Sequence, residues 1–322
     1  MEGNQIIFNQ IIFLSILVGI GVLSTKLKVI NESVKDGIAK LIFQITLPLL
    51  IFTSVARIDL TPEIIRNSGL LFFYTYLALL IMFIVGTVFS RLTKLNGNQG
   101  AVFINHHMFG NIVFLGFPLM DALFPGGEAM LYASIYLLAS NTTMWTLGVW
   151  VFLKGNNGPR KDVIKNLINP NIIALILGLA VMFSGLKIPD LIYDPFSGVG
   201  KTTIYLSMLY IGAMLAYMPI RGALKKFHVY LVSFNKLILL PVILTIVIYT
   251  LAEWLTPNFG LTARKVLIME ASMPCMAIVV VLAKRFNSDD ALATENVFVS
   301  TIASLLTLPL VYSGLIWLET WI

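Results

Sequence analysis

The stretch NHHMFGNIVFLGFP, residues 105–118, interrupts an apolar segment with two histidines, two asparagines, two glycines and a proline. Proline removes a backbone donor and clashes with the preceding turn, so a helix breaks or kinks there. Inside a membrane the freed backbone groups need polar partners, because lipid supplies none. The stretch therefore predicts a broken helix that lines a cavity or packs against a second break.

The composition is that of an integral membrane protein. Of the 322 residues, 58% are hydrophobic and 12% are charged, with a mean hydropathy of +0.88. Soluble domains are about half apolar and about a quarter charged. Apolar runs long enough to cross a hydrocarbon core recur along the chain. We expect ten membrane-spanning helices, at residues 6–24, 38–56, 68–90, 101–124, 129–153, 168–185, 201–219, 231–253, 264–283 and 295–318.

The basic residues predict an orientation and exclude some partners. Most of the 22 Lys and Arg residues fall in alternate loops, beginning with 25–40 and including 154–169. Such loops face the cytoplasm, so we expect a multi-pass protein of the plasma (inner) membrane with both termini outside. The net charge of +6 then reflects contact with anionic lipid rather than nucleic acid. The amino terminus has no basic region before its apolar run, so the first helix is expected to be retained.

The polar stretch 154–169 divides the chain into two halves, residues 1–153 and 170–322. Each half holds five expected helices, so the second half enters the membrane from the opposite side. Such inverted repeats are typical of secondary transporters. The fourth helix of each half carries a mid-membrane interruption, with Gly110, Gly116 and Pro118 in the first and Pro274 in the second. Half-helices that begin near the two prolines would direct their positive N-termini to one place, an anion site made mostly from backbone.

Five stretches spread over the chain share the pattern of one known family. They are NIVFLGFPLM (111–120), ASMPCMAIVVVLAKRF (271–286), LTLPL (306–310), NPNIIALILGL (169–179) and LPLLIFTSV (47–55). The first is similar to an Asn–x–hydrophobic–Gly–x–Pro–Leu signature, and the second to a second crossover segment. Together they resemble the auxin efflux carrier family of membrane transporters, in its bacterial type.

The resemblance implies an all-α fold of the sodium/proton-antiporter type, with ten helices in two inverted five-helix repeats and with broken helices 4 and 9 crossed. It implies a scaffold of helices 1, 2, 6 and 7, a mobile transport unit of helices 3–5 and 8–10, and a homodimer formed through the scaffold. The implied substrates are organic anions, auxin in plant members and dicarboxylates in some bacterial ones. Asn111 matches the family's substrate-contacting asparagine, and Gly116, Pro118 and Pro274 belong to the same expected substrate site. The short central loop departs from the plant members, which weakens a claim to auxin itself.

Three titratable residues are candidates for proton or cation coupling. His106 and His107 titrate near neutral pH; alternatively, one packs beside a polar helix and the other faces cytoplasmic water, and the sequence favours this second interpretation. Glu270 is an acidic residue well inside the ninth expected helix. An intramembrane carboxylate is costly unless it is functional or paired, so Glu270 either binds a proton or cation, or pairs with Arg264 or Lys265.

Two more polar residues lie inside expected helices. Lys236 either snorkels to the inner interface, which the sequence favours, or compensates charge inside the transport unit. Asn141, with Thr142 and Thr143, either hydrogen-bonds between helices or lines the substrate cavity.

The sequence predicts no enzyme, cofactor or metal site. SGVGKTT (197–203) is not a phosphate-binding loop, because Pro195 stands where the motif needs its first glycine. HExxH and GxSxG motifs are lacking. The leading hypothesis is a carrier of a small organic anion that works by alternating access. A proton- or sodium-coupled cation exchanger on the same scaffold and a membrane sensor without turnover remain as alternatives.

Overall fold

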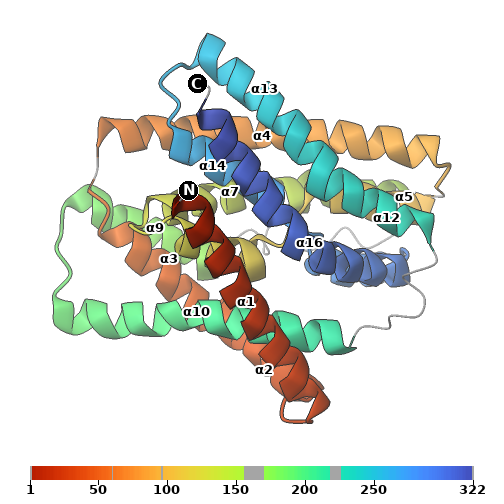
Figure 1. Ribbon diagram of the computed structural model, residues 1–322, viewed down its shortest axis with the longest axis horizontal. Coiled ribbons are helices and arrows are strands. Elements are labelled where there is room, and N and C mark those ends of the chain that lie inside the picture. The colour runs from red at the N-terminus through yellow and green to blue at the C-terminus, as the bar shows by residue number, and fades with distance from the viewer. Residues whose placement is uncertain (1, 60, 96, 156–169, 218–225, 321–322) are drawn as a thin grey trace. The chain divides into compact units, whose positions relative to one another are not determined.

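The computed structural model describes residues 2–59, 61–95, 97–155, 170–217 and 226–320. These residues form helices, and their sole β-type pairing is an isolated antiparallel bridge between Gly110 and Cys275 (Figure 1). The expected linker 154–169 lies almost wholly outside the described residues.

In chain order the α-helices and the single π turns (η) are α1 Glu2–Lys26, α2 Glu32–Leu41, η1 Ile42–Thr46, α3 Leu47–Ala56, α4 Pro62–Leu92, α5 Gly97–Met108, η2 Ile112–Gly116, α6 Phe117–Leu123, α7 Glu128–Thr143, η3 Met144–Gly148, α8 Val149–Gly155, α9 Pro170–Ser184, α10 Asp190–Tyr217, α12 Phe227–Phe234, η5 Asn235–Leu239, α13 Leu240–Leu255, α14 Leu261–Ala271, α15 Ile278–Arg285 and α16 Asp290–Glu319.

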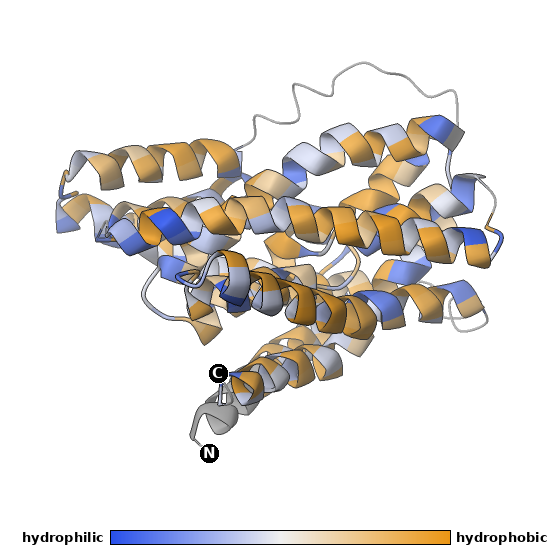
Figure 2. Ribbon diagram, turned by 90° about the horizontal axis from the view of Figure 1, so that it is seen from above, coloured by the Kyte–Doolittle hydropathy of each residue, from blue (hydrophilic) through white to orange (hydrophobic). Residues whose placement is uncertain are grey.

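The all-helical prediction is confirmed for this part of the chain, and the expected segments fall on helix there except at two breaks, inside 101–124 and 264–283. Five helical stretches are long and apolar enough to cross a membrane, namely Glu32–Ala56, Pro62–Leu92, Asp190–Tyr217, Phe227–Leu255 and Asp290–Glu319. Hydrophobic residues run along most of the length of the helices (Figure 2). Large apolar side chains stay exposed on them, as Ile246 (63%) and Leu310 (70%) do. Lipid-facing helices have this pattern, whereas a soluble protein rarely exposes large contiguous apolar patches.

Prolines follow three of the π turns at the same offset. Pro48, Pro118 and Pro241 each come two residues after the last residue of η1, η2 and η5. A proline ring clashes with the carbonyl four residues earlier, which in each case lies inside the π turn, and the wider turn accommodates it. The sequence predicted a break near Pro118, but the helix continues through this residue. The non-helical residues are Phe109–Asn111, and η2 continues directly into α6.

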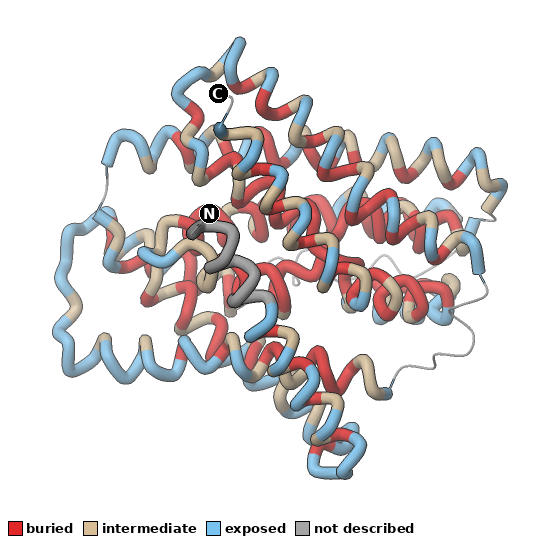
Figure 3. Tube along the Cα trace, in the orientation of Figure 1, coloured by how far each residue is buried: buried red, intermediate tan, exposed pale blue. Residues whose placement is uncertain are grey.

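The chain divides into two compact units, and each is described by itself. Unit 1 comprises residues 1–69, 113–135 and 168–217, and unit 2 comprises residues 70–112, 136–167 and 218–322. In unit 1, α10 packs along α1 and α3, and α3 packs on α9. The face of α10 turned away from these helices is exposed over much of its length (Figure 3). In unit 2, α16 contacts α5, α12, α14 and α15.

Glycines allow the close approach of α1 and α10. A Cβ atom built at Gly21 would lie 2.5 Å from the carbonyl oxygen of Leu209, and one at Gly212 would collide with the carbonyl oxygen of Val18. Small residues at such crossings let two backbones approach within van der Waals contact.

We expect Gly212→Ala to destabilise unit 1 by about 1–3 kcal/mol, because the added methyl group overpacks a backbone contact. The measurement is the thermal unfolding midpoint of the purified protein in detergent. Gly198→Ala, on the same helix but with nothing within 4 Å of the added atom, is the matched control. Equal midpoints for the two variants would contradict the packing described here.

Candidate functional site

Two helix breaks in unit 2 pair with each other through their backbones. The first break is Phe109–Asn111, after α5, and the second is residues 272–277, between α14 and α15. The Asn111 N–H donates to the carbonyl oxygen of Pro274 at 2.8 Å, and the Met276 N–H donates to that of Phe109 at 3.2 Å. A broken helix at membrane depth needs such partners, since lipid offers none. The predicted polar pairing of breaks is therefore present, with Gly110 rather than Pro118 at its centre.

The two breaks approach so closely that position 110 has no room for a side chain. A Cβ atom built on Gly110 would lie 2.9 Å from the Cβ of Met273 and 3.0 Å from the Met273 carbonyl oxygen. Both atoms belong to the opposing break, whose backbone is held by the bridge to Cys275. A larger residue at position 110 would force the two segments apart.

The backbone donors of the breaks are already partly engaged. The N–H groups of Asn111 and Met276 bond across the pair, and that of Cys275 donates to the Ser300 hydroxyl oxygen at 3.0 Å. A substrate anion would have to displace these bonds in order to use them. An anion site made mostly from backbone, as the sequence suggested, is therefore less favourable here than one that includes a side-chain cation.

Lys236 is a side-chain cation that lies beside the first break. Its side chain is fully buried, and its Nζ donates to the carbonyl oxygens of His107 at 3.0 Å and Met108 at 3.5 Å. These carbonyls end α5, where the helix dipole is negative. The expectation that Lys236 snorkels to the interface is therefore wrong. Within the described residues no carboxylate lies within ion-pair distance of its ammonium.

Both histidines are fully buried, so the expectation that one of them faces cytoplasmic water is also wrong. The Nδ1 of His107 lies 2.8 Å from the Phe103 carbonyl oxygen, and its Nε2 lies 3.1 Å from the Nδ2 of Asn235. These partners fit a neutral ring with its proton on Nδ1. The Nδ1 of His106 lies 3.1 Å from the Nδ2 of Asn296. Both rings pack beside polar side chains, as the second interpretation expected for one of them, and a role in proton transfer stays a prediction.

Glu270 is fully buried near the end of α14, and its two carboxyl oxygens have no hydrogen-bond partner among the described residues. The alternative that it pairs with Arg264 or Lys265 is wrong. Lys265 pairs with Glu319 at 3.1 Å, and the Nε of Arg264 donates to the Phe259 carbonyl oxygen at 2.8 Å. A buried carboxyl without a partner is far more stable neutral than ionised. Binding of a proton or a cation by Glu270 stays a prediction that this burial favours.

The remaining predicted residues are less informative. Asn141 is buried on α7, and beside it the Thr142 hydroxyl lies 2.6 Å from that of Tyr76 on α4, a hydrogen bond between helices. Gly116 and Pro118 belong to unit 1, at the junction of η2 and α6. Asn111 is 2% exposed. Substrate contact by these residues is a prediction that the geometry leaves standing.

Three polar residues around the breaks were not predicted from the sequence. Asn296 and Ser300, four residues apart on α16, contact His106 and the Cys275 N–H, and Asn235 contacts His107. Polar side chains on one face of an otherwise apolar helix were the signal for the first two.

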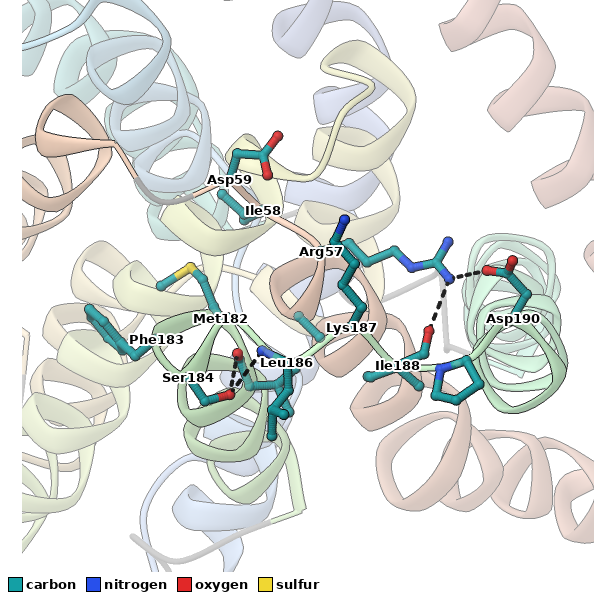
Figure 4. A pocket seen from close by; sticks show the side chains of 14 residues that line it. Arg57, Ile58, Asp59, Met182, Phe183, Ser184, Leu186, Lys187, Ile188 and Asp190 are labelled. Carbon is teal, nitrogen blue, oxygen red and sulfur yellow. Dashed lines mark hydrogen bonds and ion pairs between the residues drawn. The ribbon is translucent and has the colours of Figure 1, made fainter.

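A cavity of about 810 Å³ lies in unit 1, between the end of α3 and the α9–α10 connection (Figure 4). None of the predicted site residues line it. Its Arg57 is neutralised by Asp190, donates to the Ile188 carbonyl oxygen and stacks 3.4 Å from the ring centre of Tyr193. Because the charge of Arg57 is already compensated by Asp190, the cavity is a weaker candidate for anion binding than the surroundings of Lys236.

We expect Gly110→Ala to separate the paired breaks, because the new methyl group meets Met273. Hydrogen exchange measured by mass spectrometry should become faster in peptides that contain Asn111 and Met276. Gly314→Ala, where the added atom meets nothing within 4 Å, is the control in the same unit. Unchanged protection of both peptides in a folded Gly110→Ala protein would show that the bridge does not hold the breaks together.

Comparison with known proteins identifies the family of this chain. A family model described as membrane transport protein matches residues 6–312. An uncharacterized transporter of Methanocaldococcus jannaschii is 24% identical over 307 residues, covering 93% of this chain and 96% of its own length. An uncharacterized transporter of Methanothermobacter thermautotrophicus is 28% identical over 306 residues, with 92% and 94% covered. The chain therefore belongs to this family of membrane transport proteins, that of the auxin efflux carriers which its motifs resemble.

Proposed function

We propose that this transporter carries a small organic anion across the plasma membrane by alternating access. One observation carries the proposal: Lys236 holds a fully buried ammonium beside the paired breaks, and its hydrogen-bond partners in the described part of the chain are uncharged. An intramembrane cation is costly and marks a substrate or ion pathway. A carboxylate that arrives beside it supplies the missing counter-charge.

The proposed site combines this charge with hydrogen-bond donors. Asn111, whose backbone is fixed on Pro274, presents an amide that donates to a carboxylate without burying a further charge. Asn141 keeps its predicted role in lining the substrate cavity, and Gly116 and Pro118 stay predicted substrate-site residues. No cofactor or metal takes part.

The proposed architecture is ten helices in two inverted five-helix repeats, with the fourth and ninth crossed at their breaks and both termini outside. A scaffold of helices 1, 2, 6 and 7 forms a homodimer, and helices 3–5 and 8–10 move against it in the manner of an elevator. Two features support this. Interrupted helices at corresponding positions of two halves mark transporter binding sites, and α1, α3, α9 and α10 pack with one another in unit 1.

The substrate class that fits is a mono- or dicarboxylate, such as an auxin-like acid, malate or malonate. The nearest rival, a proton- or sodium-coupled cation exchanger, would need carboxylates at the breaks. Glu270 is the acidic candidate there, and the buried Lys236 repels cations. A sensor without turnover would bind the same anion without moving it, and flux separates the two.

We expect Lys236→Gln to lower the kcat/KM of organic-anion uptake at least tenfold, since a hydrogen bond to a charged group is worth about 1.5–3 kcal/mol. Asn111→Ala should raise KM in the same assay. The measurement is uptake by proteoliposomes of labelled malate, malonate, citrate, indole-3-acetate and sodium, with Lys284→Gln, which removes an exposed cation, as the control. Lys236→Arg keeps the charge and should retain part of the activity.

Two results would decide against the proposal. Sodium flux or pH-driven cation exchange alone would favour the antiporter. Normal anion kinetics in folded Lys236→Gln and Asn111→Ala proteins would remove both residues from the site.

We propose in addition that Glu270 carries a coupling proton. Its carboxyl is fully buried, with Tyr136 as a titratable neighbour. Glu270→Gln mimics the protonated form, so we expect it to fold normally and to transport anion without stimulation by a pH gradient. Uptake measured with and without an inward proton gradient tests this, and stimulation of the variant equal to that of the natural protein would refute it.

A further inference from the structure

Unit 2 contains a second buried cation without a counter-ion. Arg264, in the first turn of α14, is 4% exposed. Its Nε donates to the Phe259 carbonyl oxygen at 2.8 Å. Across the described parts of the chain, no carboxylate lies within ion-pair distance of its guanidinium. Arginines are almost never this deeply buried unless they are paired, because an uncompensated charge is costly to desolvate.

Aromatic rings fix the guanidinium without neutralising it. Its Cζ lies 5.4 Å from the ring centre of Tyr249, on α13, and 5.9 Å from that of Phe259. Tyr74, on α4, stacks on Phe259 with ring centres 5.1 Å apart, and its hydroxyl lies 2.8 Å from that of Thr256. Cation–π contacts offset part of the desolvation cost but supply no negative charge. Arg264 is therefore held in place with its charge uncompensated.

Tyr249 adds a second unpartnered polar group at the same place. It is 4% exposed, and its hydroxyl is buried without a hydrogen-bond partner among the described residues. A buried tyrosine hydroxyl normally finds a partner. A guanidinium fork offers donors whose geometry matches a carboxylate, and a phenol adds a further donor. Glu319 pairs with Lys265 through Oε2, and its carboxylate does not lie within ion-pair distance of Arg264.

We propose that Arg264 and Tyr249 form a carboxylate-binding site where the substrate anion is captured before it reaches Lys236. The site lies at the end of α14 that is remote from the breaks. Arg264 is seven positions before Ala271, the last residue of α14, which is about 10 Å along the helix axis. Cations spaced along a route raise the local concentration of anions. The inference rests on the proposed function and extends it from one anion site to two sites in series.

The test uses the full-length protein in vesicles of neutral lipid. Initial rates of malate uptake are measured against concentration for Arg264→Gln, Tyr249→Phe and the control Lys284→Gln. We expect Arg264→Gln to raise KM about tenfold, because the variant loses one charge-assisted contact with the anion. The kcat should change less than about twofold. Tyr249→Phe keeps the ring beneath the guanidinium but removes the hydroxyl, and should raise KM about threefold. The control should match the natural protein.

A second readout is independent of flux. Malate should raise the thermal unfolding midpoint of the natural protein in detergent, and this rise should be lost in Arg264→Gln. If no organic anion is transported but malate still stabilises through Arg264, the proposed function fails while this site is supported. Normal uptake kinetics in Lys236→Gln, together with a raised KM in Arg264→Gln, would remove Lys236 from the proposed site while supporting the site at Arg264.

Three outcomes would overturn the inference. The first is an unchanged KM and unchanged stabilisation in a folded Arg264→Gln protein. The second is an unfolded Arg264→Gln protein together with a natural KM in Tyr249→Phe, which would make the cluster a structural clamp. The third is Arg264-dependent stabilisation by phosphatidylglycerol but not by malate, which would assign the site to a lipid headgroup.

Discussion

Backbone groups at a helix break must be satisfied where no water is available, and this constraint organises unit 2. Two breaks meet this need jointly, through the bonds of Asn111 to Pro274 and of Met276 to Phe109. Each unsatisfied group would cost several kcal/mol in lipid, so neither break is stable without the other. Gly110 follows from the same constraint, since a side chain there would prevent the approach.

The polar cluster around the breaks extends this pairing outward. η5 places Asn235 on the His107 ring and Lys236 on the carbonyl oxygens that end α5. α16 contributes Asn296 to His106 and Ser300 to the Cys275 N–H. The cluster thus satisfies much of its own hydrogen bonding but leaves a positive charge uncompensated. A site that is neutral only when an anion is present will hold that anion more strongly than a neutral molecule of the same shape.

The apolar runs were sufficient to predict the helices, because about 20 apolar residues are what a bilayer requires. Pairing of two interruptions was also predictable, because a lone break has nowhere to place its donors. The second break contains Pro274, as predicted, but the first lies at Gly110, at one end of the predicted interruption and away from Pro118. Proline marks a place where a helix is strained, but a π turn absorbs that strain at Pro118, and the chain opens instead at Gly110. The burial of Lys236 could not be predicted from the sequence, for another reason. Snorkelling depends on whether a neighbouring segment covers the side chain, and no pattern within one helix reports its neighbours.

The π turn before Pro241 determines more than the fit of a proline ring. A π turn holds one residue more than an α turn, so the helix before it is rotated relative to the helix after it. In an α-helix one residue corresponds to about 100° of rotation. η5 therefore lets a single continuous helix present Lys236 inward while Val242 and Ile246, on α13, stay exposed. Removing one residue from η5 would restore regular α-helical winding. The helix could then keep Val242 and Ile246 on its exposed face or keep Lys236 buried, but not both.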